Sequence, residues 1–316
     1  MAIVDRPAFE ARATHTGPDG PYGYVPTEWI CILFVVLFSV TSALHLGQAL
    51  YYRLWFLFPT VILGGIGEII GWSGRLWSSR NITLLDPFLM QITTTIIAPT
   101  PLVAANFVIL GQLIRRLGPK YSRLSPIWYT IVFVTCDLVA LVVQAVGGAN
   151  ASLAVQDGRD PGPGGNIMLG GIIVQLVAIV IYMALAAEFV IRFVLNKPIR
   201  NAEGGRYEGT HQLDTKIKLM LTGLIFSSVV IFIRSIYRTI ELTDGWDGRI
   251  IGTQVYFNVL DGGMITLAFY CMNIFHPGCL LGNGKEWKRT NSLETIQVDA
   301  TEEKKRSNES YAPSAV

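Results

Sequence analysis

Long apolar runs separated by short polar segments dominate the chain from residue 29 onward. An apolar run of about 20 residues can cross the hydrocarbon core of a bilayer as a helix. The runs are continuous and do not alternate with a period of two, which favours helices over barrel strands. Seven such runs occur: Trp29–Leu50, Trp55–Trp77, Phe88–Ile114, Ile127–Val146, Ile167–Val194, Leu219–Ile240 and Ile250–Phe275. The pattern predicts an all-α, polytopic bundle of seven transmembrane helices over residues 29–278.

The remaining residues form polar tails. Residues 1–28 are rich in Gly and Pro, and residues 279–316 are charged and rich in Ser and Thr, so we expect the second tail to be disordered. No cleavable signal peptide precedes the first span. Composition supports the membrane assignment, because 51% of the residues are hydrophobic and only 15% are charged, against about a quarter in soluble domains. The net charge of +2 gives no reason to expect a nucleic-acid partner.

The basic residues of the loops and tails predict the orientation. Lys and Arg number 7 on the side of the amino-terminal tail and 17 on the other side. Positive loops stay in the cytosol, so the amino terminus should be outside and the carboxyl terminus cytosolic, most simply in the plasma membrane. The sequons at Asn81 and Asn150 fall in loops that this topology places outside, which makes both residues candidate N-glycosylation sites.

Polar groups inside the spans are the candidate functional residues, since such groups are costly in lipid and often mark a ligand or ion pathway. Three pairs are seven residues apart and therefore share a helix face: Glu68 with Arg75, Asp137 with Gln144, and Arg234 with Glu241. The spans that carry them can turn these faces toward one interior. The candidate substrate-binding residues are Glu68, Arg75, Asp137, Gln144, Gln175, Arg234, Tyr237, Arg238, Glu241 and Asp261.

Two interpretations of these residues remain open. They can line a polar cavity that opens to the outer leaflet, with carboxylates from Glu68, Asp137 and Asp261 and with Arg234 as the counter-charge. Alternatively, they can form a closed salt-bridge network that fixes the register of the bundle. The number of ionisable groups favours the cavity. His45 lies nearer the inner side, where local hydrogen bonding explains it best.

Glycine and proline residues predict features of two spans. Gly67 and Gly71 have the small-x-x-x-small spacing that permits close helix packing. Pro99 and Pro101 lie in the middle of the third span, where each removes a backbone donor, so we expect a kink there. The kink can be purely architectural or can serve as a flexible element.

Several motifs inside the spans share their spacing with a known family. They are Glu68-x-x-Gly71-Trp72-x-x-Arg75, Phe133-x-x-x-Asp137, Arg234-x-x-Tyr237-Arg238-x-x-Glu241 and the closing His276-Pro277-Gly278. On these motifs the membrane domain resembles the fungal lipid-translocating exporters named for aminocholesterol resistance, which include a sphingoid long-chain base exporter. The chain departs from the usual family pattern at Gln112, Ala149 and Gln254, which bears on the identity of the ligand more than on the fold.

The resemblance implies export of lipids or toxic amphiphiles, with membrane lipids and an amphipathic substrate as partners. Glu68, Asp137 and Asp261 would then surround a cationic headgroup. The chain has no G-x-x-x-x-G-K-[ST] motif, so transport would proceed without ATP hydrolysis. No cofactor or metal motif is found, and four histidines, of which only His45 is deep in a span, argue against a zinc amidase. The alternative is a seven-helix receptor or lipid sensor, although Asp-Arg-Tyr and Asn-Pro-x-x-Tyr motifs are missing from the expected spans.

Overall fold

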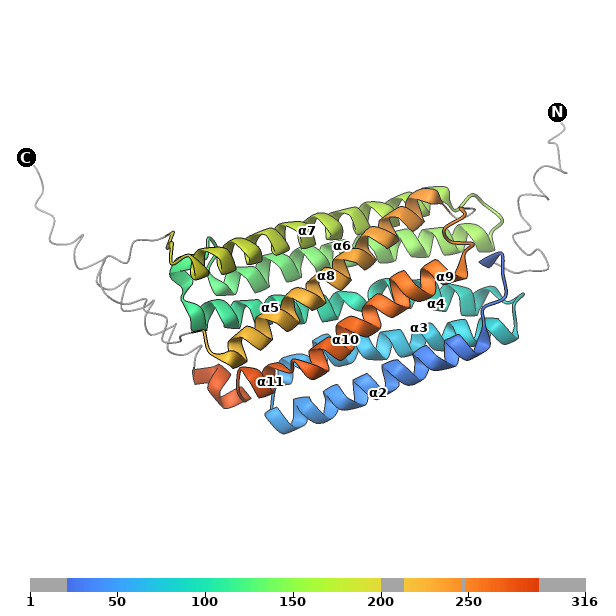
Figure 1. The fold of residues 1–316 in the computed structure, drawn as a ribbon. Coiled ribbons are helices and arrows are strands. Elements are labelled where there is room, and N and C mark those ends of the chain that lie inside the picture. The colour runs from blue at the N-terminus through green and yellow to red at the C-terminus, as the bar shows by residue number, and fades with distance from the viewer. Residues whose placement is uncertain (1–21, 200–212, 246–247, 290–316) are drawn as a thin grey trace, which may run out of the picture.

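A computed structural model describes residues 22–199, 213–245 and 248–289, and Figure 1 shows their fold. Seven stretches of helix are long and apolar enough to cross a membrane, which confirms the predicted all-α fold and makes the chain a multi-pass membrane protein. No strand occurs in the part of the chain that the structure describes. The helices of the spans are α2 (Glu28–Tyr52), α3 (Leu63–Arg80), α4 (Leu85–Ile97), α5 (Pro99–Leu117), α6 (Pro126–Gln156), α7 (Gly162–Val194), α8 (Thr215–Asp244) and α10 (Met264–Ile274).

Short helical segments complete the spans. They are η2 (Trp55–Leu57), η3 (Phe58–Ile62), η4 (Pro119–Tyr121), α9 (Gln254–Tyr256), η5 (Phe257–Gly263) and α11 (Pro277–Leu280). η3 and η5 are π-helical, a conformation that is frequent at functional sites. The turn between the first two spans is short, as expected, and Arg53 ends α2 there in the left-handed conformation with φ 57°.

Most helix boundaries differ by a few residues from the sequence prediction, as three examples show. The sixth span begins at Thr215 instead of Leu219, because Asp214 caps the helix by accepting a 2.7 Å hydrogen bond from the Thr215 backbone N–H. The seventh begins at Gln254 instead of Ile250, after backbone turns over residues 248–253. The fourth continues to Gln156, so Asn150 lies in a helix and not in a loop, whereas Asn81 is exposed just after α3. Polar helical turns that extend beyond the apolar runs explain the longer helices.

The third span, formed by α4 and α5, lies at the centre of the bundle. In its most apolar window 78% of residues are buried, against 28–50% in the other spans. α2 packs on α3, α3 on α4, α5 on α6, α6 on α7, α7 on α8 and α8 on α10, and α10 returns to pack on α2. Figure 1 shows these helices lying side by side along one common direction. Residues carried by α3, α8 and η5 can therefore reach α4 and α5.

The predicted kink of the third span is confirmed as an interruption at Ala98 between α4 and α5. Pro99 has no N–H and cannot donate to the carbonyl of Thr95 four residues earlier. The Thr95 carbonyl is therefore free to accept a hydrogen bond from another helix.

Glycines of α3 allow it to lie very close to α4. A Cβ added at Gly71 would lie 2.6 Å from Thr95 Cγ2, and one added at Gly67 would lie 2.8 Å from Ala98 Cβ. This confirms the close packing predicted from their spacing. The approach also holds Glu68 against the middle of the bundle.

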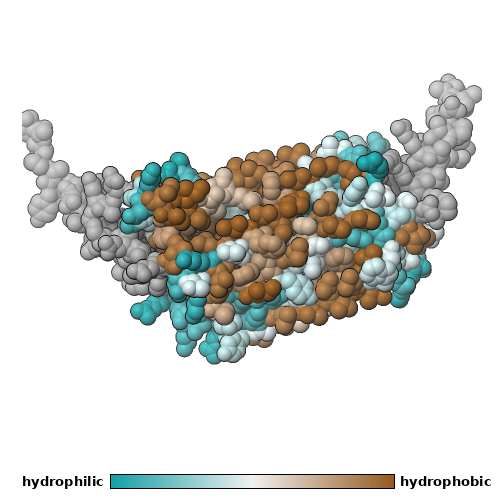
Figure 2. Space-filling view, in the orientation of Figure 1, coloured by the Kyte–Doolittle hydropathy of each residue, from teal (hydrophilic) through white to brown (hydrophobic). Residues whose placement is uncertain are grey.

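The surface has the distribution expected for a bilayer. In Figure 2 hydrophobic residues cover the middle of the visible face, and hydrophilic residues gather toward both ends. Beyond the last span, residues 284–289 are helical and the buried Trp287 stacks on Phe56 at a centroid distance of 4.9 Å. The expectation of disorder is therefore wrong for residues 284–289. Residues 290–316 lie outside the described residues, and so do residues 1–21 of the other tail.

Candidate functional site

One face of α8 carries four of the predicted site residues. Arg234, Tyr237, Arg238 and Glu241 are spaced by three, four and seven residues, so they lie on one stripe, and all four are buried. The stripe faces inward although it is polar, which requires partners on the neighbouring helices.

Asp261 in η5 is the main partner of the two arginines. Arg238 donates to both of its oxygens, from Nε to Oδ1 at 2.8 Å and from Nη2 to Oδ2 at 2.9 Å. Arg234 Nε lies 2.8 Å from the same Oδ1. Asp261 has no exposed surface. It therefore joins the sixth and seventh spans through a bidentate ion pair, the strongest geometry for a guanidinium and a carboxylate.

Thr95 of α4 is a further partner, which sequence analysis did not identify. Its hydroxyl accepts from Arg238 Nη2 at 2.9 Å, and its carbonyl accepts from Arg234 Nη2 at 2.5 Å. The carbonyl is available because Pro99 cannot bond to it. A proline four residues after a polar residue in a buried span was the signal that could have identified this contact.

Glu241 and Tyr237 complete the group at one end. Glu241 accepts from Arg238 Nη1 at 2.7 Å and from the Tyr237 hydroxyl at 2.8 Å. These contacts close a network of two guanidiniums and two carboxylates, which we call the Arg–Asp network: Thr95, Arg234, Tyr237, Arg238, Glu241 and Asp261. For these residues the structure corresponds to the closed-network interpretation.

Glu68 lies near the Arg–Asp network without joining it. Its side chain is fully buried and takes part in no ion pair among the described residues, and the indole N–H of Trp72 on the same helix interacts with it. It is close enough to Asp261, Arg234 and Arg238 to interact with their charges. A buried carboxylate without an ion-pair partner is costly, so Glu68 is the most unusual group in the bundle.

Arg75 does not pair with Glu68, although the two residues share a face of α3. Instead it donates from Nη2 to the Tyr24 hydroxyl at 2.7 Å and is surrounded by aromatic rings, with the Phe257 centroid 4.4 Å and the Tyr22 centroid 5.0 Å from Cζ. Such contacts are favourable cation–π interactions. Tyr22 and Tyr24 precede the first span; burial raises the pKa of Tyr22 to about 12 and also raises the pKa of Tyr24, where Arg75 opposes the shift.

Gln144 of the fourth span and Gln175 of the fifth bond to each other beside the Arg–Asp network and do not bond to its charged groups. Gln144 donates to Gln175 Oε1 at 3.1 Å, and Gln175 donates to Thr100 Oγ1 at 3.1 Å. Both glutamines line a space of about 10 Å³ beside Arg234 and Arg238, which is room for about one water molecule. These two residues therefore adjoin the network.

Asp137 does not belong to the network. It is buried, its Oδ2 has no hydrogen-bond partner, and none of the ion pairs among the described residues includes it. The expected convergence of Asp137 with Glu68 and Asp261 therefore stays a prediction. The helix that carries Asp137, α6, packs mainly on α7 and α5.

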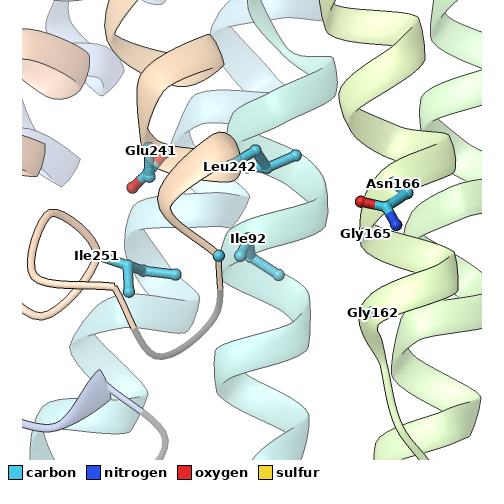
Figure 3. A pocket seen from close by; sticks show the side chains of 8 residues that line it. Ile92, Gly162, Gly165, Asn166, Glu241, Leu242 and Ile251 are labelled. Carbon is cyan, nitrogen blue, oxygen red and sulfur yellow. The ribbon is translucent and has the colours of Figure 1, made fainter.

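The space found beside these charges in the described part of the chain is small, in contrast to the expected open cavity. A crevice of about 70 Å³ lies between α4, α7 and α8, and Figure 3 shows Glu241, Leu242, Ile92 and Ile251 around it. It reaches only Glu241, at the end of the Arg–Asp network. A typical ligand pocket has about 300–1,000 Å³, so the network is closed at this end of the bundle.

Two other intramembrane groups have local partners. His45 Nε2 lies 3.2 Å from the Phe269 carbonyl, and Glu188 pairs with Arg123 at 2.6 Å and with Arg192 at 2.7 Å. Across residues 22–199, 213–245 and 248–289, no group of three His, Cys, Asp or Glu residues could hold a metal ion.

Comparison with known proteins identifies the family. The family model described as RTA1 like protein matches residues 61–284, which include all ten predicted substrate-binding residues. The chain belongs to the RTA1-like family. Within that family, it is 31% identical over 295 residues to the Sphingoid long-chain base transporter RSB1 of Saccharomyces cerevisiae, covering 86% of this chain and 76% of that protein.

Two further RTA1-like relatives from the same yeast match over most of their length. Protein RTA1 is 27% identical, with 80% of this chain and 86% of that protein covered. Protoporphyrin uptake protein 1 is 26% identical, with 83% and 92% covered. No solved structure matches the chain. The similarity to a protein named as a lipid transporter supports lipid transport as the function of this chain.

Proposed function

We propose that this chain translocates amphipathic lipids that carry a single amine in the headgroup, of the sphingoid long-chain base class, across the plasma membrane without ATP hydrolysis. The similarity to a sphingoid long-chain base transporter supports this class of substrate. In the predicted orientation, the amino terminus is outside, the Arg–Asp network lies toward the outer leaflet, and the chain confers resistance by export.

The charge count at the centre of the bundle is the observation that carries the proposal. The centre holds three carboxylates, from Glu68, Asp261 and Glu241, and two guanidiniums, from Arg234 and Arg238. Both guanidiniums pair with Asp261, and Arg238 also pairs with Glu241. Glu68 takes part in no ion pair among the described residues. One ammonium group would give Glu68 a charge-assisted hydrogen bond and balance the cluster.

The bonding of the network suggests how the headgroup could pass. Removing the water of an ammonium in the bilayer is costly, and a buried carboxylate offsets that cost. A headgroup that pairs with Glu68 comes close to Asp261 and competes with Arg234 for that carboxylate. Arg234 can then keep its hydrogen bond to the Thr95 carbonyl. Exchange of these pairs would loosen the contact between α8 and η5 and open the way toward Glu241. The acyl chain would stay in lipid between helices.

The experiment is flux of a C18 2-amino-1,3-diol across vesicles that contain the purified chain. We expect Glu68→Gln to lower the flux about tenfold or more, because the amide keeps the shape and loses the charge. Asp157→Asn is the matched control, since Asp157 is an exposed carboxylate that pairs with Arg159. Asp137→Asn tests the second buried carboxylate that the sequence proposed for the headgroup.

A C18 1,3-diol without the amine separates charge recognition from general leakiness. We expect this lipid to move slowly through the wild type and equally slowly through Glu68→Gln. Equal flux of the amine lipid through wild type and Glu68→Gln would contradict the headgroup role of Glu68. No flux above that of empty vesicles with the wild type would contradict the proposed transport.

A further inference from the structure

A second polar cavity lies at the opposite end of the bundle from the crevice of Figure 3. It has a volume of about 370 Å³ and is lined by the last turns of α2 and α10 and by the start of α11: Gly47, Gln48, Tyr51, Tyr52, Asn273, Ile274, His276 and Cys279. This volume is within the range of ligand pockets. Asn273 follows Asp261 by 12 residues, about 18 Å along a helix, so the cavity is separate from the Arg–Asp network.

Three buried polar atoms in the cavity walls lack hydrogen-bond partners. They are Gln48 Oε1, Asn273 Oδ1 and His276 Nε2, and the His276 side chain is only 2% exposed. Buried polar groups of native proteins almost always have a partner. The three atoms are buried just behind the cavity surface, so a ligand in the cavity could supply the missing hydrogen bonds if these side chains rotate toward it.

The chemistry of each free atom follows from the bonds of its side chain. Gln48 Nε2 donates to the Asn273 carbonyl at 3.1 Å, so the free Gln48 oxygen is an acceptor. Asn273 Nδ2 donates to Thr41 Oγ1, which leaves the Asn273 oxygen as a second acceptor. His276 Nδ1 accepts from the Gly278 backbone N–H at 3.1 Å, so the proton of the neutral ring is on Nε2, a free donor.

The rim of the cavity identifies the occupant as a lipid. Tyr51 and Ile274 border it and are 80% and 73% exposed, on a face that continues into the apolar surface of the bundle. An acyl chain can lie against this surface while the headgroup enters the cavity. No acidic residue lines the cavity, so recognition depends on uncharged hydrogen bonds.

We infer that this cavity is a second lipid site, which holds an amino-alcohol headgroup by two acceptors and one donor before the headgroup reaches Glu68. The inference rests on the proposed function for the direction of movement. In the predicted topology the cavity faces the cytosolic leaflet. A vicinal amine and hydroxyl supply donors for Gln48 and Asn273, and a hydroxyl oxygen accepts from His276.

The test is photolabelling of the full chain in vesicles with a C18 2-amino-1,3-diol that carries a photoreactive group next to the headgroup. We expect labelled peptides that contain residues 48–52 and 273–279. Gly47→Phe should lower this labelling at least tenfold, because a Cβ at Gly47 meets no atom within 4 Å and a larger side chain can occupy the cavity. Gly170→Phe is the matched control, since Gly170 of α7 is equally unobstructed and does not line the cavity.

His276→Asn provides a second variant that preserves the local fold. An asparagine oxygen can still accept from the Gly278 N–H as a helix cap, but the ring donor is lost, so labelling should fall about fivefold, as for one hydrogen bond. Labelling unchanged by both variants, or located in other peptides, would overturn the site. Equal competition by a four-carbon amino alcohol would show that the ligand is a soluble molecule and not a lipid.

Flux measured on the same vesicles distinguishes the two proposals. Wild-type flux together with labelling elsewhere would overturn this site and leave the proposed function intact. Labelling in the cavity that Gly47→Phe abolishes, without any wild-type flux, would confirm the site and overturn the proposed function.

Discussion

Replacement of Asp261 by asparagine should destabilise the bundle more than any other single change at the site. Asp261 is fully buried and makes three close contacts, two from Arg238 at 2.8 and 2.9 Å and one from Arg234 at 2.8 Å. Asn keeps the size but removes the charge, and its amide nitrogen would face a guanidinium. Arg234 would retain the Thr95 carbonyl, and Arg238 would retain Glu241 and the Thr95 hydroxyl.

The expected magnitude follows from the loss of one partner of a buried ion pair. Breaking such a pair costs about 3–5 kcal/mol, because the opposite charge stays buried without compensation. Asp261 compensates two guanidiniums, which places the loss toward the upper end of that range. For a chain of this size about 1 kcal/mol corresponds to about 2–4 °C, so Tm should fall by about 6–20 °C.

The assay is thermal unfolding of the purified chain in detergent, followed by tryptophan fluorescence. Asp157→Asn is the control for loss of an exposed pair, which is worth about 0–1 kcal/mol, and Glu68→Gln is the control for a buried carboxylate without an ion-pair partner. Both should melt within about 3 °C of the wild type. A Tm of Asp261→Asn equal to that of these controls would refute the reasoning, and so would a larger loss of Tm in Glu68→Gln than in Asp261→Asn.

Three further predictions concern packing and the region before the first span. Gly71→Leu should lower Tm strongly, because its Cβ would lie 2.6 Å from Thr95 Cγ2, and the same melting assay checks this. Trp287→Ala should lower the free energy of unfolding by about 3–5 kcal/mol, because the indole no longer stacks on Phe56. Limited proteolysis checks that residues 284–289 stay docked in this variant. Because burial raises the pKa of Tyr22 from 10 to about 12, its stabilising effect is complete below pH 10 and is lost as the pH rises through 12. Ultraviolet titration of tyrosinate should show this late step in the wild type and not in Tyr22→Phe.

The sequence was sufficient to predict the helices and the face of α8. Long apolar runs define the spans because the bilayer leaves few alternatives to a helix. Arg234, Tyr237, Arg238 and Glu241 share a face because of their spacing alone, and the structure places all four in the Arg–Asp network. Spacing within one helix is local information, and a helix preserves it.

Partners on other helices could not be predicted in the same way. Glu68 and Arg75 share a face of α3, yet Arg75 contacts Tyr24, 51 residues away, because the segment before the first span folds over that end of the bundle. Asp137 was grouped with Glu68 and Asp261 by depth in the bilayer, but depth does not specify rotation about the helix axis. Thr95 was missed because a threonine in a span usually bonds to its own helix, as Thr95 also does with the Gln91 carbonyl.

In the two proposals, the two ends of the bundle would recognise a headgroup by different interactions, and this difference would constrain the substrate. The cavity at the carboxyl-terminal end offers free hydrogen-bonding atoms and no carboxylate, so it can bind hydroxyl and amine groups without selecting for charge. The centre has three carboxyl groups and two guanidiniums, so one ammonium could pair with Glu68, the carboxyl group that takes part in no ion pair there. The oxygens of a phosphate group are acceptors, so they could bond only to the His276 donor at the first site, and they would be repelled by the carboxylates of the second. Under the two proposals, selection for a monovalent amino alcohol would use both sites in sequence: hydrogen bonds would admit the headgroup, and pairing with Glu68 would decide whether it passes.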